Sequence, residues 1–282
     1  MDALGYYNGT WGSLDEMTVP MNDRACFFGD GVYDAAICYK KTIYLLDNHI
    51  DRFFNSAKLL EINPGVSKDQ LKDLLNDMAA KVDHDAVLVY WQVSRGTARR
   101  NHVFPEGPSN LWIMIKAAVI PDLNKKVKLV TVEDTRFLHC NIKTLNLIPG
   151  VIAAQRAKEA GAHEAVFHRG NIVTECAHSN VHIIKNGKFI THPADRYILK
   201  GIARGHLAQI CDAIGVPVEE REFTLDELFD ADEALTSSTS TFGLGVDNID
   251  GKPVGGRAPE LLKKIQDAVM ADFREATGYG KS

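Results

Sequence analysis

The chain contains a lysine among apolar neighbours and, further along, a glutamate that follows a predicted strand. Lys143 lies in the run Cys-Asn-Ile-Lys-Thr-Leu-Asn over 140–146, and Glu175 lies in Thr-Glu-Cys-Ala-His-Ser-Asn over 174–180. An amine in apolar surroundings is costly to keep charged, which favours its neutral, nucleophilic form. A carboxylate fixed beside a pyridine nitrogen keeps that nitrogen protonated. Together these groups are the minimum parts of a pyridoxal phosphate (PLP) site.

Other residues could bind the phosphate of such a cofactor. Phosphate is bound by backbone N–H groups at a helix start, by hydroxyls and by a cation. A predicted helix begins near 199–204, where Gly201 would let an anion approach the backbone closely. Residues 236–241 are all Ser or Thr, and Arg52 could supply the cation. A flexible loop would also explain the hydroxyl run, and a helix surface would explain the arginine, so the hypothesis depends on their joint occurrence.

The composition limits the class of protein. The chain has 282 residues, 45% hydrophobic and 24% charged, with a net charge of −5, which argues against nucleic acid as the main partner. We expect a protein without membrane spans, because no apolar stretch is long enough and the first residues lack the apolar segment of a secretory signal. Five cysteines without a CxxC pair indicate reduced thiols in the cytoplasm, and the absence of HExxH predicts no metal site.

The apolar periodicity predicts an α/β first half. Helical spacing predicts helices, and runs of Val, Ile, Leu and aromatic residues predict strands. Pro121-Asp122-Leu123-Asn124 then breaks the pattern with turn-forming residues, which places a linker there. The expected helices cover 48–60 and 67–82, with Ser67 as the N-cap of the second. The expected strands cover 86–94 and 111–120, and the domains cover 1–120 and 125–282 with 121–124 between them.

The second half is predicted to be rich in strands. Gly170-Asn171, Asn186-Gly187 and Asp250-Gly251 are turn pairs between apolar runs and predict three hairpins. Hairpins with a few intervening helices indicate an α+β protein whose second domain is barrel-like. The expected elements are a strand over 126–133 and helices over 150–160, 199–214 and 259–276.

These motifs together resemble the fold-type IV PLP aminotransferases, and most closely the D-amino acid transaminases. The resemblance covers almost the whole chain, and several specific blocks occur in the right order. The blocks are 28–33, 49–52, 95–97, 142–146, 174–175 with 179–180, 199–202 and 236–241.

The resemblance implies a role for each residue. Lys143 would be the Schiff-base lysine and proton shuttle, and Glu175 would pair with the pyridine nitrogen. The cofactor-binding set would comprise Arg52, Lys143, Glu175, Ser179, Asn180, Leu199, Gly201, Ile202, Ala203, Ser238 and Thr239. Two departures stand out: Ala203 replaces a hydroxyl residue that often binds the phosphate, and His178 lies in a segment that is often serine-rich.

Substrate binding would rest on the Arg-x-His segment formed by Arg100 and His102, reaching over from the other subunit of a homodimer. Arginine binds a carboxylate bidentately and is always charged, so this segment would hold the substrate α-carboxylate. Tyr33 and Ser240 would complete the substrate site. The alternative interpretation is an exposed basic loop before Pro105.

The resemblance also implies a fold and a reaction. The fold would be a small N-terminal α/β domain and a larger C-terminal pseudo-barrel, with the cofactor between them. The expected reaction is ping-pong transamination between a D-amino acid, such as D-alanine or D-glutamate, and 2-oxoglutarate or pyruvate. The alternatives are a branched-chain L-amino acid aminotransferase, an aminodeoxychorismate lyase, and a PLP-binding protein without turnover. Arg100 and His102 favour the D-amino acid enzyme, and the intact lysine and glutamate weigh against a mere binding protein.

Overall fold

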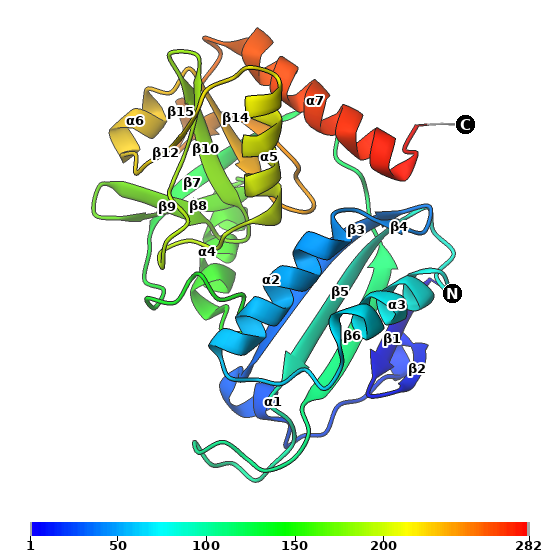
Figure 1. Ribbon diagram of the computed structural model, residues 1–282. Coiled ribbons are helices and arrows are strands. Elements are labelled where there is room, and N and C mark those ends of the chain that lie inside the picture. The colour runs from blue at the N-terminus through cyan, green and yellow to red at the C-terminus, as the bar shows by residue number, and fades with distance from the viewer. Residues whose placement is uncertain (1, 281–282) are drawn as a thin grey trace. The chain divides into compact units, whose positions relative to one another are not determined.

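The computed structural model describes residues 2–280 and divides the chain into two compact units (Figure 1). Unit 1 contains the chain up to Ile120, the short segment Ile142–Asn146 and the chain from Phe273 onward. Unit 2 contains Pro121–Asn141 and Leu147–Asp272. The first break coincides with the linker expected from the sequence, but two segments assigned by the sequence to the second domain belong to unit 1.

Unit 1 is built on a six-stranded antiparallel sheet in the order β2-β1-β6-β5-β3-β4. Most residues of its long strands β3 and β5 are buried, which agrees with their Val-, Ile- and aromatic-rich sequences. The strands are β1 (Ala3–Tyr7), β2 (Thr10–Ser13), β3 (Gly31–Tyr39), β4 (Thr42–Ile43), β5 (Ala86–Ser94) and β6 (Asn110–Ala117).

Helices α2 (Leu46–Leu59) and α3 (Lys68–Ala79) cover one face of this sheet (Figure 1). Their apolar stripes face a core formed around Trp91 and Phe53, both of which are fully buried. The predicted N-cap of α3 is confirmed, because the Ser67 hydroxyl accepts from the Gln70 N–H and the Gln70 side chain accepts from the Ser67 N–H. A 3-10 turn (Leu14–Glu16) and α1 (Arg24–Phe28) precede β3.

Unit 2 contains a nine-stranded sheet in the order β12-β11-β10-β13-β14-β7-β8-β9, with β15 paired to β14. Strands β9 and β10 stand far apart in this order, yet only three residues connect them, so the sheet must curl back on itself. The strands are β7 (Lys126–Glu133), β8 (Glu164–Arg169), β9 (Ile172–Cys176), β10 (Asn180–Lys185), β11 (Lys188–Thr191), β12 (Val218–Glu220), β13 (Glu233–Ser237), β14 (Leu244–Ile249) and β15 (Lys252–Pro253).

All three hairpins predicted from turn residues are present, as β8–β9, β10–β11 and β14–β15. The turns Asn186-Gly187 and Asp250-Gly251 have positive φ at both residues, which is the geometry that a two-residue hairpin prefers. The mixture of curled sheet and helices confirms the α+β class.

Four helices accompany this sheet: α4 (Ile148–Glu159), α5 (Ile202–Ala213), α6 (Leu225–Phe229) and α7 (Pro259–Thr277). Helix α4 packs on β7 and β8, and α6 packs on β9. Helix α5 begins at Ile202, three residues later than the sequence predicted, because Gly201 has extended dihedrals (φ −61°, ψ 136°) and is the N-cap residue. Among residues 2–280 no helix is long and apolar enough to cross a membrane.

The segment Ile142–Asn146 is fastened to β3 of unit 1 by backbone hydrogen bonds. The Tyr33 N–H donates to the Lys143 carbonyl at 3.0 Å, and the Leu145 N–H donates to the Gly31 carbonyl at 3.1 Å. The Lys143 N–H donates to the buried hydroxyl of Ser56 on α2 at 3.2 Å. These bonds fix the backbone of the candidate lysine to a rigid sheet, although the lysine is distant from that sheet in sequence.

Close packing around Gly31 provides a test of this attachment. A Cβ on Gly31 would lie 2.5 Å from the Val93 carbonyl oxygen and 2.7 Å from Leu145 Cδ1, whereas a Cβ on Gly205 in α5 meets nothing within 4 Å. Gly31→Ala should therefore lower the free energy of unfolding by about 1–3 kcal/mol through overpacking. The control Gly205→Ala should raise it by about 0.5–1 kcal/mol, because alanine favours a helix interior. Thermal melts measure both effects, and equal midpoints for the two variants would contradict the packing described here.

Candidate active site

The side chain of Lys143 extends over an aromatic ring. Its Nζ lies 4.2 Å from the centroid of the Tyr33 ring, and the neighbouring Ile142 is buried. The Tyr33 ring is stacked on Tyr90 with the centroids 5.3 Å apart, and burial raises the pKa of Tyr90 well above its usual range. The structure thus brings together Lys143 and Tyr33, two residues that the sequence assigned to catalysis and substrate binding.

Arg52 belongs to a buried cluster in the same unit. Its Nε and Nη2 donate to the two carboxylate oxygens of Asp34, at 2.8 and 2.7 Å, and the His49 ring lies 2.8 Å from one of them. Burial alone would raise the pKa of Asp34, but the Arg52 guanidinium and His49 together hold it well below its usual range. Burial lowers the pKa of His49 despite this carboxylate. Asp34 therefore fixes the direction in which the Arg52 guanidinium points.

Arg100 and His102 lie against one phenylalanine ring in unit 1. The Arg100 guanidinium carbon is 5.2 Å from the centroid of Phe28, and the His102 ring is 5.1 Å from it. Both residues are exposed, as is the rest of the loop from 99 to 104. The structure therefore presents the two predicted carboxylate-binding side chains together, on an accessible loop.

In unit 2, Glu175 lies on β9 with both carboxylate oxygens occupied by donors. Arg136 Nη1 donates to Oε1 at 2.5 Å, and Asn180 Nδ2 donates to Oε2 at 3.0 Å. The Leu199 N–H lies 3.1 Å from both oxygens. Only 5% of Glu175 is exposed, and a buried carboxylate requires such donors to remain charged.

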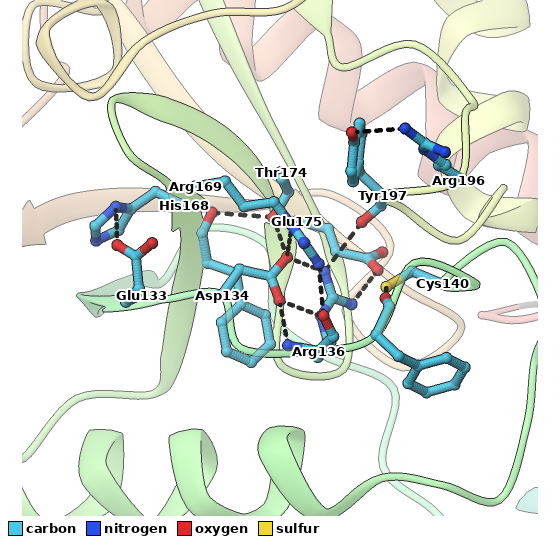
Figure 2. Close-up of polar contacts among 12 residues, drawn as sticks. Glu133, Asp134, Arg136, Cys140, His168, Arg169, Thr174, Glu175, Arg196 and Tyr197 are labelled. Carbon is cyan, nitrogen blue, oxygen red and sulfur yellow. Dashed lines mark hydrogen bonds and ion pairs between the residues drawn. The ribbon is translucent and has the colours of Figure 1, made fainter.

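A second buried carboxylate holds Arg136 in place (Figure 2). Arg136 Nε and Nη2 donate to the two oxygens of Asp134, each at 2.9 Å, and the guanidinium lies over the Phe167 ring at 4.6 Å. Arg169 Nε adds a hydrogen bond to Asp134 at 3.1 Å. Burial opposes ionisation of Asp134, but the bonds from Arg136 hold the pKa of that carboxyl below its usual range. The pKa of Arg136 is raised, because its two acidic partners outweigh burial.

Asn180 links Glu175 to the segment that leads into α5. Its Nδ2 donates both to Glu175 and, at 3.1 Å, to the Leu199 carbonyl. A Cβ on Gly201, the N-cap residue of α5, would lie 2.0 Å from Asn180 Oδ1, so only glycine fits at that position. Asn180, Leu199 and Gly201 thus form one packed group beside the glutamate.

The start of α5 has the features of an anion site. As in every α-helix, the N–H groups of the first turn, which include Ile202 and Ala203, have no acceptor within the helix. In α5 no side-chain hydrogen bond caps them, in contrast to α3 and α6. The hydroxyl run forms a tight turn, in which Ser238 Oγ accepts from the Ser240 and Thr241 N–H groups at 3.2 and 3.1 Å. Gly243, at the end of this turn, lies against Leu207 of α5.

Not every predicted site residue joins these groups. The Ser179 hydroxyl donates to Glu164 Oε2 at 2.7 Å, and His178 pairs with the same carboxylate at 3.2 Å. Thr239 and Ser240 lie in the hydroxyl turn, where the Ser240 and Ser238 hydroxyls are 3.3 Å apart. The cofactor roles of Ser179 and Thr239, and the substrate role of Ser240, stay predictions.

Three residues that the sequence interpretation missed fix the side chains of Arg52 and Glu175. They are Asp34, which binds Arg52, and Arg136 with Asp134 behind it, which bind Glu175. Asp134 and Arg136 come directly after a predicted strand and are two residues apart, a spacing that places side chains on one face of an extended chain. That spacing is a usable signal for a shared polar contact. Asp34 had a weaker signal, a single acid within the apolar run of β3.

One group of metal-type ligands occurs elsewhere in unit 2. His192, Asp195 and Glu222 each offer a ligand atom, and these atoms lie within 4.8 Å of one another. Glu222 is exposed and Asp195 is partly so, and accessible acidic groups often gather without an ion. The expectation that the chain needs no metal stays a prediction.

The residues of these groups fit PLP. Lys143 offers an amine, Glu175 offers a buried carboxylate at a strand end, and the uncapped start of α5 offers N–H groups for a phosphate. A Cβ at position 201 would collide with Asn180, so the residue before α5 carries no side chain and an anion can approach its backbone closely. These are the groups that would hold the aldehyde, the ring nitrogen and the phosphate.

Solved structures share this fold. The branched-chain aminotransferase from the archaeon Thermoproteus uzoniensis, solved with norvaline, superposes with a TM-score of 0.88 at 20% identity, covering 99% of this chain and 96% of that one. The branched-chain amino acid aminotransferase from Escherichia coli gives 0.87 at 21% identity, covering 99% and 95%. At this level of identity the similarity establishes the fold.

Sequence comparison establishes the family. A D-alanine aminotransferase from Listeria monocytogenes serotype 4b is 36% identical over 271 residues, covering 94% of each chain, and one from Staphylococcus haemolyticus is 36% identical, covering 93% of this chain and 95% of the relative. Residues 31–249 match the model of the amino-transferase class IV family. The chain therefore belongs to the class IV aminotransferases and is a PLP-dependent enzyme.

Proposed function

We propose that the protein transfers the amino group of a D-amino acid, such as D-alanine or D-glutamate, to 2-oxoglutarate or pyruvate. One observation carries this proposal: curated D-alanine aminotransferases match nearly the full length at 36–38% identity. The exposed pair of Arg100 and His102 on Phe28 agrees with it, because a charged arginine suits a carboxylate substrate. The branched-chain enzymes match only at low identity and share the fold.

Lys143 and Glu175 have different roles in the proposed reaction. When bound, PLP supplies an aldehyde that bonds amines and a ring that withdraws electrons from the substrate α-carbon. Lys143 would hold the cofactor through its amine and would carry the proton that leaves the substrate α-carbon. Glu175, held by Arg136, stabilises a proton on the ring nitrogen.

The phosphate is held by fixed groups of the backbone and by hydroxyls. The N–H groups of Ile202 and Ala203 point from an uncapped helix start, and Ser238 contributes a hydroxyl. Arg52 supplies a positive charge whose direction Asp34 sets. Ala203 lacks the hydroxyl often found at this position, so one hydrogen bond to the phosphate would be either lost or made through water.

The protein acts as a homodimer in this proposal. Helix α4 exposes Ile148, Val151 and Ile152, which are 68%, 60% and 53% exposed and lie on one face of the helix at spacings of three and four residues. An exposed apolar face of this kind is typical of a subunit interface. The loop with Arg100 and His102 would then serve the active site of the partner.

The cytoplasm is the proposed location. All five cysteines are free thiols, and burial raises the pKa of Cys38 and Cys140 to about 11. Thiols of this kind are suited to a reducing compartment.

The amine of Lys143 is the first target for a test. Lys143→Ala should abolish transamination of D-alanine with 2-oxoglutarate, a loss beyond the roughly 10²–10⁴-fold that a positioned proton-transfer group contributes. Borohydride reduction of the wild-type holoenzyme and peptide mapping should place the cofactor on the peptide that contains Lys143. Lys158→Ala, on the exposed face of α4, should retain activity. A label on another peptide would overturn the assignment.

Substrate preference tests the role of Arg100. Arg100→Ala should raise the KM for D-alanine by about 10–100-fold with a small change in kcat, because a hydrogen bond to a charged group contributes about 1.5–3 kcal/mol. Arg99→Ala, the exposed neighbour, is the matched control and should keep the wild-type KM. Wild-type enzyme should act on D-alanine and leave L-leucine unchanged; the reverse preference would support the branched-chain alternative instead.

A charge on α4 tests the homodimer. Ile152→Glu should convert the dimer to a monomer at micromolar concentration, because a carboxylate cannot be buried in an apolar contact without a partner. Lys125→Glu, at an exposed position outside α4, serves as the control. Sedimentation velocity distinguishes the species, and a dimeric Ile152→Glu variant would exclude this face from the interface.

A further inference from the structure

A buried arginine holds the exposed loop that carries Arg100 and His102. Only 3% of Arg24, on the single-turn helix α1, is exposed, and arginine is rarely buried without specific partners. Its Nε donates to Asp30 Oδ2 at 2.7 Å. Its Nη1 donates to the carbonyl oxygens of Asn101 at 2.6 Å and Val103 at 3.3 Å. The two carbonyls belong to the residues that directly follow Arg100 and His102.

Asp30 extends this arrangement to the base of the loop. Arg95, where the chain leaves β5, donates from Nε to both Asp30 oxygens at 3.1 and 3.0 Å. Arg95 also donates to the carbonyl oxygens of Leu60 and Glu61 at 2.7 and 3.0 Å. Its guanidinium carbon lies 3.6 Å from the centroid of the Phe104 ring. One carboxylate therefore connects an arginine beneath the tip of the loop with an arginine at its base.

The Phe28 ring contacts both Arg24 and the two side chains of the loop. The Arg24 guanidinium carbon lies 4.9 Å from its ring centroid, while Arg100 and His102 approach the same ring at 5.2 and 5.1 Å. Arg24 and Phe28 both come from α1, and the Asp23 side chain caps this helix by accepting from the Ala25 N–H. In Figure 1, α1 lies at the end of the unit 1 sheet from which the β5–β6 loop extends.

The contacts of Arg24 order a loop that is otherwise exposed. Val103 and Phe104 are 71% and 55% exposed, so apolar packing alone cannot fix this segment. Fixing a backbone costs conformational entropy, which must be offset either in the free protein or when substrate binds. Hydrogen bonds from a buried, charged donor to two loop carbonyls offset that cost before binding.

We propose that Arg24 is a positioning residue for substrate recognition: through Asp30, the Asn101 and Val103 carbonyls and Phe28, it holds Arg100 and His102 ready for the substrate carboxylate. This inference rests on the proposed function, in which those two residues bind the α-carboxylate. Arg24 acts through the loop and touches no reacting atom. Lysine cannot replace it, because a single ammonium group cannot reproduce the planar fork that reaches Asp30 and the carbonyls together.

The test compares Arg24→Lys with wild-type holoenzyme on two amines. One substrate is D-alanine, and the other is isopropylamine, which has no carboxylate. The ratio of kcat/KM for D-alanine to that for isopropylamine should fall about tenfold or more in Arg24→Lys, through the KM for D-alanine. A general loss of structure would lower both values and leave the ratio unchanged, which would overturn the proposal. Arg99→Lys, on the same loop, is the control and should keep the ratio.

Hydrogen exchange gives a readout that does not depend on activity. Amides of residues 99–104 should exchange faster in Arg24→Lys than in wild type, whereas the amides of α3 should not change. Unchanged exchange in the loop would contradict the positioning role. If Arg24→Lys does not fold, Arg24→Gln keeps a donor for one carbonyl and is measured in the same two ways.

The result for Arg100→Ala separates this inference from the proposed function. If Arg100→Ala raises the KM for D-alanine while Arg24→Lys does not, the positioning role fails and the proposed function stands. If Arg100→Ala leaves the KM unchanged, the carboxylate role of the loop fails, and the positioning inference fails with it.

Discussion

The pair between Arg136 and Glu175 is the interaction on which the proposed cofactor site depends. A buried carboxylate is stable only when donors replace the lost water, and here an arginine, an amide and a backbone N–H do so. Arg136 is in turn fixed by Asp134, which two arginines contact. A carboxyl group surrounded by donors therefore stands at a defined place on β9, which is the preorganisation that the proposed pairing with a ring nitrogen requires.

Carboxylates also fix arginine side chains at two places in unit 1. Asp34 directs Arg52 with a bidentate contact, and Asp30 connects Arg24 with Arg95. In each case a carboxylate of low exposure restricts the side chain of an arginine, because the planar fork leaves few ways to satisfy both oxygens. The flexible arginine side chain thereby becomes a rigid support for a candidate phosphate or carboxylate site.

The sequence predicted the local elements well and the supporting contacts poorly. The Ser67 cap of α3, the bounds of β5 and the three hairpins follow from short-range rules on capping, periodicity and turn residues. The attachment of Ile142–Asn146 to β3 could not be predicted, because it depends on backbone hydrogen bonds between distant segments. Arg24 reaches a carbonyl 77 residues away, and no spacing rule expresses such a contact.

Replacement of Asn180, even by the similarly shaped aspartate, would disturb several contacts near Glu175 at once. One Nδ2 serves both the Glu175 carboxylate and the Leu199 carbonyl, so an aspartate would place a second negative charge against two acceptors. The Oδ1 of the same amide occupies the space where any side chain at Gly201 would begin. The Asn180 amide therefore fixes the positions of the Glu175 carboxylate and the Leu199 backbone. It also excludes every residue except glycine at position 201. Because Gly201 directly precedes α5, one side chain sets the position of Glu175, the proposed partner of the ring nitrogen, and of the helix start proposed to bind the phosphate.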